Sequence, residues 1–522
     1  MKKFLSKYDK QLTTAVAGLL VFLFWRFIRP CMLTYQEQFQ LFLFDDDYLY
    51  SRLIQPGGIA RYVAEFLVQL YNNVTFGAIV LAVAFVLVQV LTWLMLKAKS
   101  ADTDIRSWYP LSFIPSILLL YTGSDENVML TYTISLIISM LMAWAYQVSM
   151  EGKSRVCRYV TLAVIIPLLY WIVGPLVIIA ALYMLPLSAI YAVACVLLSS
   201  LFVPYPVVCL FYGIDYYRSP EILSFMLIVI PVVALVIAYL TRLLPQINHR
   251  WSYVMAVVLL CLTVFMVRSG YDERKYNLME YDFLVRTRNW DAIIKKSQQK
   301  MPDLPMSVSA NNLALAMKGQ LGDRVFDFYQ NGSQGLMPLF ERNFATTQLT
   351  GEVYFNIGMI NTAQRYAFEA MEAIPNCDKS SRAVRRLAET NLINGNYGVA
   401  RKYLRMLQKT LFYRPWALRT EKLLGDEKAI NDHPLYGWLR KAKISNDDLF
   451  SESEIDKICG QLFLHNKDNK VALQYMLMVP LLDGDIPRFM RYMRVVEDNS
   501  RYVPGVLPMI MNKYRVPQSA LR

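Results

Sequence analysis

The sequence predicts an all-α protein in which a polytopic bundle of transmembrane helices is followed by a soluble α-solenoid of helical repeats. The chain of 522 residues is 55% hydrophobic, which exceeds the apolar content of a typical soluble domain of this length. Long apolar runs end near Val267, and a mixed, charged sequence follows. We therefore expect a multi-span membrane domain at 1–268 and a soluble helical-repeat domain at 269–522.

The first expected span is Leu12–Phe27, an apolar run that follows the basic start MKKFLSKYDKQ. The segment is similar to a signal peptide. However, bulky Trp25 and Ile28, followed by Arg29, leave no cleavage site of small residues. It is therefore expected to remain as an uncleaved span with its N-terminus in the cytoplasm.

Three further expected spans are Val74–Leu96, Trp108–Tyr121 and Val128–Val148. Positive charges follow the second and fourth spans and mark those loops as cytoplasmic; they include Lys97, Lys99, Arg106, Lys153, Arg155 and Arg158. The loop between the third and fourth spans is therefore expected outside.

The apolar stretch Tyr159–Val203 is interrupted by prolines and glycine, so its crossings are ambiguous. Three short crossings, or one crossing with a re-entrant hairpin, both fit, and three are favoured. Leu223–Leu240 and Trp251–Val267 complete a total of about nine spans. This count predicts a multi-pass inner (plasma) membrane protein whose C-terminal domain is periplasmic or extracellular.

The first expected external loop, 31–73, contains the segment YQEQFQLFLFDDDYLYSR with the consecutive aspartates Asp45, Asp46 and Asp47. Carboxylates beside a bilayer are costly to desolvate, so a cluster there is a candidate functional site. The flanking aromatic residues suit the membrane interface.

The soluble half contains one clear helix-turn-helix, AVRRLAETNLINGNYGVARKYLRML at Ala383–Leu407. Small Ala400 stands where two helices must approach closely, and Leu404 follows one turn later. This segment resembles a tetratricopeptide repeat, and weaker copies surround it. Such repeats imply a concave surface that binds peptides or partner domains.

Basic residues of this region are candidates to line that surface: Arg382, Arg385, Arg386, Arg401, Lys402 and Arg405. The alternative is that they cover exposed faces of amphipathic helices, which is their commoner role. The formal net charge of +13 agrees with either interpretation. A basic soluble half beside a membrane also fits contact with anionic lipid.

The first half resembles the polytopic C-class glycosyltransferases, which use a polyprenyl-phosphate sugar as donor. In that superfamily the first external loop carries an acidic residue followed by aromatics and a basic residue. Here Asp47-Tyr48-Leu49-Tyr50-Ser51-Arg52 is similar to that pattern. Gly57–Tyr71 looks like the interfacial helix that follows the motif. Asp125 and Glu126, on the next external loop, match a second acidic pair in placement.

The resemblance implies roles for these residues. Asp47, with Asp46 as its substitute, would deprotonate the acceptor hydroxyl. Arg52, Arg61 or a divalent cation would face the charge on the departing lipid phosphate. The expected metal ligands are Asp45, Asp125 and Glu126. The structural alternative is that Asp45–Asp47 only cap and solvate the helix that follows.

Two functions remain open. One is an integral membrane glycosyltransferase that transfers a sugar from a polyprenyl-phosphate donor on the non-cytoplasmic face. The other is a non-enzymatic membrane scaffold whose helical repeats recruit envelope-assembly partners. The expected partners are membrane lipid, a lipid-linked sugar and a protein on the repeat domain. Nucleic acid is not expected, because no recognised binding motif accompanies the charge.

Overall fold

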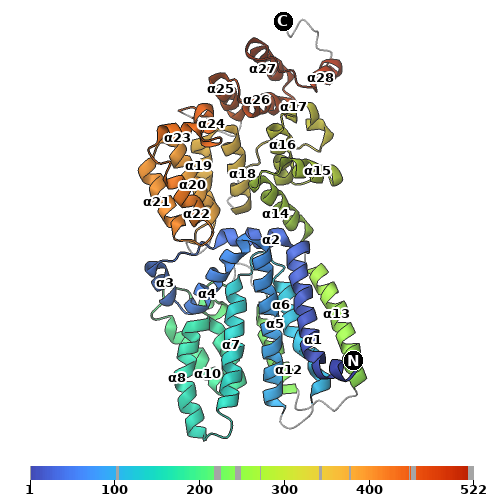
Figure 1. Ribbon diagram of the computed structural model, residues 1–522, viewed down its shortest axis with the longest axis vertical. Coiled ribbons are helices and arrows are strands. Elements are labelled where there is room, and N and C mark those ends of the chain that lie inside the picture. Colours follow the sequence, from blue (N-terminus) through green and yellow to red (C-terminus); the bar gives the residue numbers. More distant parts are fainter. Residues whose placement is uncertain are drawn as a thin grey trace. The chain divides into compact units, whose positions relative to one another are not determined.

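A computed structural model of the chain describes residues 2–100, 105–216, 225–240, 249–270, 272–339, 344–374, 378–445, 447 and 454–514. The described residues form helices and no β-strand, which confirms the all-α prediction (Figure 1). The chain divides into two compact units, Met1–Asp272 and Glu273–Arg522, here called the N-terminal and C-terminal units.

The N-terminal unit is a helical bundle with short 3₁₀ and π-helical turns between its helices. Its elements are α1 (Lys2–Leu23), η1 (Phe24–Ile28), α2 (Pro30–Gln36), η2 (Glu37–Phe39), α3 (Asp46–Leu53), α4 (Gly58–Val68), η3 (Gln69–Asn72), α5 (Val74–Lys99), η4 (Arg106–Phe113), α6 (Ile114–Thr122), α7 (Leu130–Ser149), α8 (Arg155–Val173), η5 (Gly174–Leu176), α9 (Val177–Met184), α10 (Ser188–Ser199), α11 (Val207–Tyr212), α12 (Phe225–Leu240) and α13 (His249–Ser269).

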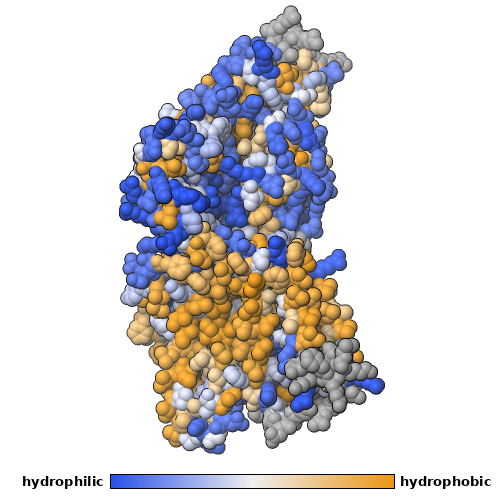
Figure 2. Space-filling view, in the orientation of Figure 1, coloured by the Kyte–Doolittle hydropathy of each residue, from blue (hydrophilic) through white to orange (hydrophobic). Residues whose placement is uncertain are grey.

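Five helical segments of the described chain are long and apolar enough to cross a membrane. They are Asp9–Ile28, Val74–Lys99, Leu130–Ser149, Arg155–Met184 and Arg250–Ser269. Apolar side chains cover much of the visible face of this unit (Figure 2). The five segments agree with a multi-pass membrane protein but are fewer than the roughly nine spans that we expected.

The difference arises from helices that are too short. The expected span Trp108–Tyr121 is a 3₁₀ segment joined to the 9-residue α6. The expected crossings within Tyr159–Val203 become the single candidate Arg155–Met184 and the 12-residue α10. A 12-residue helix rises only about 18 Å, short of the ~30 Å hydrocarbon layer.

The helix α5 is central to the bundle, where it packs against α1, α6, α7 and α12. The helix α7 packs in turn against α4 and α9, and α4 also contacts α8. These contacts fix α4, which belongs to the expected external loop, on the bundle. The candidate site on α3 and α4 therefore rests on the helices α7 and α8.

Two glycines allow this close approach. Gly57, at the start of α4, donates its backbone N–H to the carbonyl of Trp171 at 2.9 Å, and the indole of Trp171 donates to the carbonyl of Leu53 at 2.7 Å. Gly174, at the end of α8, has φ +73° and ψ −148°, a conformation that only glycine adopts readily. A Cβ on Gly174 would lie 3.7 Å from the Cα of Gly57. The backbone angles, rather than lack of space, therefore require glycine at position 174.

We predict that Gly174→Ala loosens the corner between α8 and α9. The strained backbone should cost about 1 to 3 kcal/mol. Amide hydrogen exchange of the detergent-solubilised protein should rise in α4 and around the corner. The matched control is Gly398→Ala, because Gly398 lies within a helix and its Cβ would meet open space. Unchanged exchange in the Gly174 variant would show that the corner tolerates a side chain.

The C-terminal unit consists of shorter helices. They are α14 (Glu273–Arg286), α15 (Trp290–Gln299), α16 (Pro305–Met317), α17 (Leu321–Arg324), η6 (Val325–Asp327), α18 (Phe344–Ile357), α19 (Ile360–Glu372), α20 (Ser381–Asn394), α21 (Tyr397–Gln408), α22 (Arg414–Glu421), α23 (Glu427–Asp432), α24 (Tyr436–Ala442), α25 (Ile455–His465), α26 (Lys470–Leu482), α27 (Ile486–Asn499) and α28 (Leu507–Tyr514).

Successive helices of this unit pack on one another, as α18 does on α19, α19 on α20 and α20 on α21. The predicted helix-turn-helix is present as α20 and α21, joined at Gly395 with φ +81°. Ala400 is fully buried at the crossing. The sequence pattern therefore identified this helix pair correctly.

The unit also makes contacts that an open array of repeats lacks, because α26 packs against α16, α17 and α18. The amide of Gln474 on α26 donates to the carbonyl of Ala316 and accepts from the backbone N–H of Leu321, at 3.1 and 2.9 Å. These buried hydrogen bonds join the two ends of the unit. The packing thus does not establish the predicted solenoid.

Candidate functional site

Asp45, Asp46 and Asp47, which belong to the loop expected outside, lie at the start of α3. Asp45 precedes the helix with an extended backbone, and its side chain makes no capping hydrogen bond. Asp46 and Asp47 form the first turn, and both side chains are exposed. Carboxylates in the first turn interact favourably with the helix dipole. Asp46 and Asp47 therefore lie at a solvated helix start, whereas the capping that the structural alternative expects of Asp45 is not seen.

A buried ionic cluster lies beside this helix start and centres on Glu65 of α4. The Glu65 side chain is fully buried and accepts from Arg52 Nε at 2.9 Å and from Arg61 Nε at 2.8 Å. The hydroxyl of Tyr48 donates to Glu65 Oε2 at 2.5 Å. The predicted phosphate-binding residues Arg52 and Arg61 therefore do come together, but around a carboxylate of the chain itself.

A second carboxylate completes the cluster. Asp215 reaches Arg61 Nη1 with a distance of 2.8 Å, and Arg61 also donates to the side-chain amide of Gln55 at 3.3 Å. Asp215 lies in a loop, yet it neutralises a buried guanidinium. The cluster thus balances Arg52 and Arg61 against Glu65 and Asp215, so it carries no excess positive charge for a phosphate.

The pKa shifts of Glu65 and Tyr48 agree with a stable buried ion pair. Burial by itself would raise the pKa of Glu65, but Arg61 and Arg52 outweigh it and lower that pKa. Burial raises the pKa of Tyr48 well above its ordinary value, and the charge on Glu65 adds to this effect. Glu65 is therefore an anion at neutral pH, and Tyr48 is a neutral hydrogen-bond donor.

Aromatic rings cover the cluster on the side of α3. Phe42 is buried and contacts Phe44, Tyr48, Tyr62 and Phe66, with ring centroids 4.9 to 5.6 Å apart. Phe44 is half exposed, which suits a residue at a membrane interface. The rings exclude water from the ion pairs and so strengthen them.

Sequence reasoning missed Glu65, although a signal was present. Arg61 and Glu65 stand four residues apart in the otherwise apolar segment GGIARYVAEFLVQLY. Opposite charges at this spacing lie on one face of a helix and pair readily. Asp215 had no such signal, because its partner is far away in the sequence.

Asp125 and Glu126 lie in the tight turn between α6 and α7. Asp125 Oδ1 accepts from the backbone N–H of Asn127 at 2.9 Å, and Glu126 Oε1 accepts from the side chain of Asn127 at 3.3 Å. Within the described part of the chain, no three His, Cys, Asp or Glu residues gather to hold a metal ion. The predicted ligands Asp45, Asp125 and Glu126 are therefore not brought together as one group.

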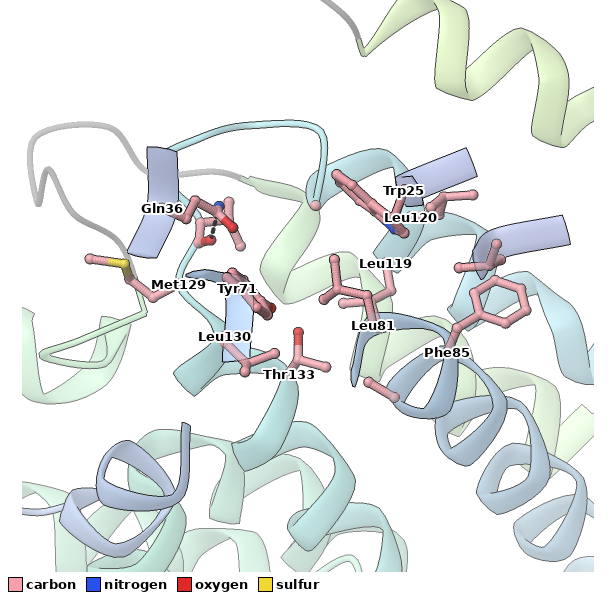
Figure 3. A pocket seen from close by; sticks show the side chains of 14 residues that line it. Trp25, Gln36, Tyr71, Leu81, Phe85, Leu119, Leu120, Met129, Leu130 and Thr133 are labelled. Atoms are coloured by element: carbon pink, nitrogen blue, oxygen red, sulfur yellow. Dashed lines mark hydrogen bonds between the residues drawn. The ribbon is translucent and has the colours of Figure 1, made fainter. Parts of the chain in front are cut away.

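A small cavity lies between α1, α5, α6 and α7 (Figure 3). Its volume is about 50 Å³, and most of its lining is apolar. Polar groups at its edge come from Gln36, Tyr71 and Thr133, and none of the predicted site residues lines it. Ligand pockets usually measure ~300 to 1,000 Å³. This cavity can hold a few water molecules but no sugar.

A second charged cluster lies in the C-terminal unit, and we call it the arginine face. It comprises Asp282 and Arg286 on α14, Arg288 just after that helix, Glu352 and Phe355 on α18, Arg382, Arg385, Arg386 and Glu389 on α20, Trp416 on α22 and Tyr436 on α24. Arg382 pairs with Asp282 at 2.7 Å and with Glu352 at 3.2 Å. Arg386 bridges Glu352 and Glu389 at 2.8 and 3.0 Å.

Burial would raise the pKa of Glu352, but Arg386 and Arg382 lower it to about 2. The guanidinium of Arg386 lies 3.4 Å from the ring centre of Phe355, and that of Arg385 lies 4.7 Å from Trp416. Such cation–π contacts orient guanidinium groups. Arg382, Arg385 and Arg386 thus form one ordered cluster, whereas Arg401 pairs separately with Glu421.

A family model matches residues 7–510, and its description is "Family of unknown function (DUF6057)". The match covers both units. No curated protein and no solved structure matches the chain.

Proposed function

The chain belongs to the DUF6057 family, and from its geometry we propose that it is a non-enzymatic membrane scaffold. In this proposal the N-terminal unit anchors the protein in the membrane. The C-terminal unit binds a partner protein, which it holds at the membrane surface. The proposal includes the predicted orientation, with the C-terminal unit outside the cytoplasm and partners that act in envelope assembly.

One observation carries the proposal: Glu65 occupies both arginines that a sugar-phosphate donor would need. Arg52 and Arg61 each lie within 2.9 Å of its carboxylate, and Glu65 is fully buried. A donor phosphate would have to displace this carboxylate inside a water-excluded cluster, which costs several kcal/mol. The arrangement supports a structural role for the loop.

The C-terminal unit supports the second part of the proposal. Its consecutive packed helix pairs resemble tetratricopeptide repeats, which serve as binding surfaces for other proteins. The arginine face also combines ordered guanidinium groups with the aromatic side chains of Phe355 and Trp416. Arginine and aromatic residues are enriched at protein interfaces.

The second candidate function is the membrane glycosyltransferase. The observation that favours it is the exposure of Asp46 and Asp47 at the start of α3, in the loop between the first two candidate spans. An acceptor hydroxyl could reach these carboxylates from solvent. In that case the aspartates would be essential, whereas the arginine face would be dispensable.

A matched pair of variants separates the two functions. Asp46→Asn with Asp47→Asn removes the candidate base, and Arg385→Gln with Trp416→Ala alters the arginine face. We expect the aspartate variant to retain wild-type surface glycans and to copurify its partner from native membranes after crosslinking. The arginine-face variant should lose most of that partner, since loss of one such anchor typically costs at least ~2 kcal/mol of binding.

Both variants must be inserted and folded for the comparison, which thermal unfolding in detergent establishes. Altered glycans in the aspartate variant, with an unaffected arginine-face variant, would overturn the scaffold proposal and favour the enzyme.

A further inference from the structure

Arg288 occupies a backbone position that normally requires glycine. It lies between α14 and α15 with φ +55°, and it is the one non-glycine residue with positive φ within the described chain. Its N–H donates to the carbonyl of Val285 at 3.0 Å, and the next N–H, of Asn289, donates to Leu284 at 2.9 Å. These bonds end α14 with a left-handed residue, where glycine is usual. A strained residue of this kind points to a function for its side chain.

The Arg288 side chain lies near the charged groups that α18 and α20 contribute to the arginine face. Solvent reaches it, yet the surrounding protein still lowers its pKa by desolvation. Among the nearby charges, Glu352 and Glu389 raise that pKa, and Arg386 and Arg385 lower it, with Glu352 having the largest of these four effects. The strained backbone therefore places a partly desolvated cation beside both carboxylates and guanidinium groups. Within the described part of the chain, the Arg288 side chain makes no ion pair or hydrogen bond.

The exposed part of this face is cationic. The carboxylates lie deep, with side-chain exposures of 10% for Asp282, 7% for Glu352 and 5% for Glu389. Arg385 is 44% exposed, and Arg288 is also exposed. The buried carboxylates thus hold the guanidinium groups in place. A molecule that binds at the surface contacts the exposed guanidinium groups of Arg288 and Arg385.

Arg286 supplies a further hydrogen-bond donor on the side of α14 that carries Asp282. Arg286 stands one helical turn after Asp282 on α14, and its Nε atom is buried without a hydrogen-bond partner. A buried donor without a partner destabilises the protein, and a bound acceptor would remove that cost.

We propose that the arginine face binds an acidic peptide segment of the partner protein, with glutamate or aspartate side chains that reach Arg288 and Arg385. This inference rests on the proposed scaffold function and names the chemistry of its partner. Charge complementarity carries the choice of ligand. Carboxylates fit the paired N–H groups of guanidinium, and Trp416 offers an apolar contact beside them.

The depth of the cluster favours a peptide over a bilayer surface. The Arg386 side chain is only 14% exposed and Arg382 only 7%. Lipid headgroups in a flat surface would reach the exposed Arg385 but not these deeper groups. The Arg288 side chain is partly desolvated by the surrounding protein, and a flexible peptide can project a carboxylate toward it.

The test uses the full-length protein in nanodiscs of zwitterionic lipid and a fluorescein-labelled octaglutamate peptide, with octaglutamine as the uncharged control. Fluorescence anisotropy should show binding of octaglutamate that weakens with added salt. Arg288→Gly should weaken it about tenfold, as expected for loss of one charge-assisted contact. It should also raise the melting temperature by a few degrees, because glycine relieves the left-handed backbone.

Arg401→Gln is the matched control, since it removes one arginine that pairs with Glu421 outside the arginine face. Its effect on binding should stay below about twofold. Three results would each overturn the inference. The two variants could weaken binding equally, or octaglutamate could fail to bind. The protein could also bind phosphatidylglycerol vesicles but not octaglutamate. If octaglutamate fails to bind while the crosslinked partner is still retained, this inference fails alone. If the wild-type protein recovers no crosslinked partner from native membranes, the scaffold function itself is contradicted.

Discussion

Glu65→Ala is expected to destabilise the N-terminal unit by about 3 to 5 kcal/mol, the usual cost of leaving buried charges without their partner. The substitution removes the carboxylate that pairs with Arg52 and leaves Arg61 with Asp215 as an ion-pair partner. It also removes the acceptor for the hydroxyl of Tyr48. Since α3 and α4 meet at this cluster, these two helices should lose their order first.

Thermal unfolding in detergent and amide hydrogen exchange of α3 and α4 measure this effect. Asp47→Asn is the control, because its side chain is exposed and its loss should change stability by less than about 0.5 kcal/mol. Similar stabilities for the two variants would mean that Glu65 does not hold the loop together.

The second large effect concerns Glu352 in the arginine face. The pKa of its carboxyl falls from the ordinary 4.5 to about 2 in the folded protein, so its ionised form stabilises the fold. A lowered carboxyl pKa contributes stability that is complete above the unfolded pKa and disappears as the pH falls toward the folded pKa. Glu352→Gln should therefore cost about 3 kcal/mol at neutral pH and almost nothing near pH 2.

Chemical denaturation of the wild type and the Glu352→Gln variant between neutral pH and pH 2 measures this difference. The partly exposed Glu280, which pairs with Lys296, supplies the control variant Glu280→Gln. That control should change stability by less than about 1 kcal/mol at any pH. A Glu352→Gln penalty that stays constant down to pH 2 would show that packing, rather than charge, is responsible.

Local sequence patterns predicted the helices well. Val74–Leu96 and Trp251–Val267 were recognised as apolar runs, and they are α5 and α13 within a few residues. The turn at Gly395 was found because glycine ends a helix at a fixed place in the pattern. These features depend on neighbouring residues, so the sequence displays them directly.

Features that depend on distant residues were not predicted. Arg61 and Asp215 form an ion pair across a long stretch of sequence, and nothing near Asp215 indicates its partner. The Glu65 carboxylate changes Arg52 and Arg61 from candidate phosphate ligands into partners of a buried ion pair. The aspartates were recognised as a cluster, but only the structure showed how Asp46 and Asp47 are placed.

The count of spans failed for a related reason. An apolar segment such as Ser188–Ser199 looks like a crossing by composition, but its 12 residues form a helix shorter than a bilayer. Burial against other helices explains apolar residues equally well. Ala192 and Val196, for example, are fully buried inside the unit.

Retention of the crosslinked partner by the two double variants tests the scaffold most directly. The measured quantity is the amount of partner recovered per molecule of folded protein from native membranes. The scaffold function predicts wild-type recovery for the variant with Asp46→Asn and Asp47→Asn. It predicts the loss of most of the partner for the variant with Arg385→Gln and Trp416→Ala. Full recovery with the arginine-face variant, together with altered surface glycans in the aspartate variant, would contradict it.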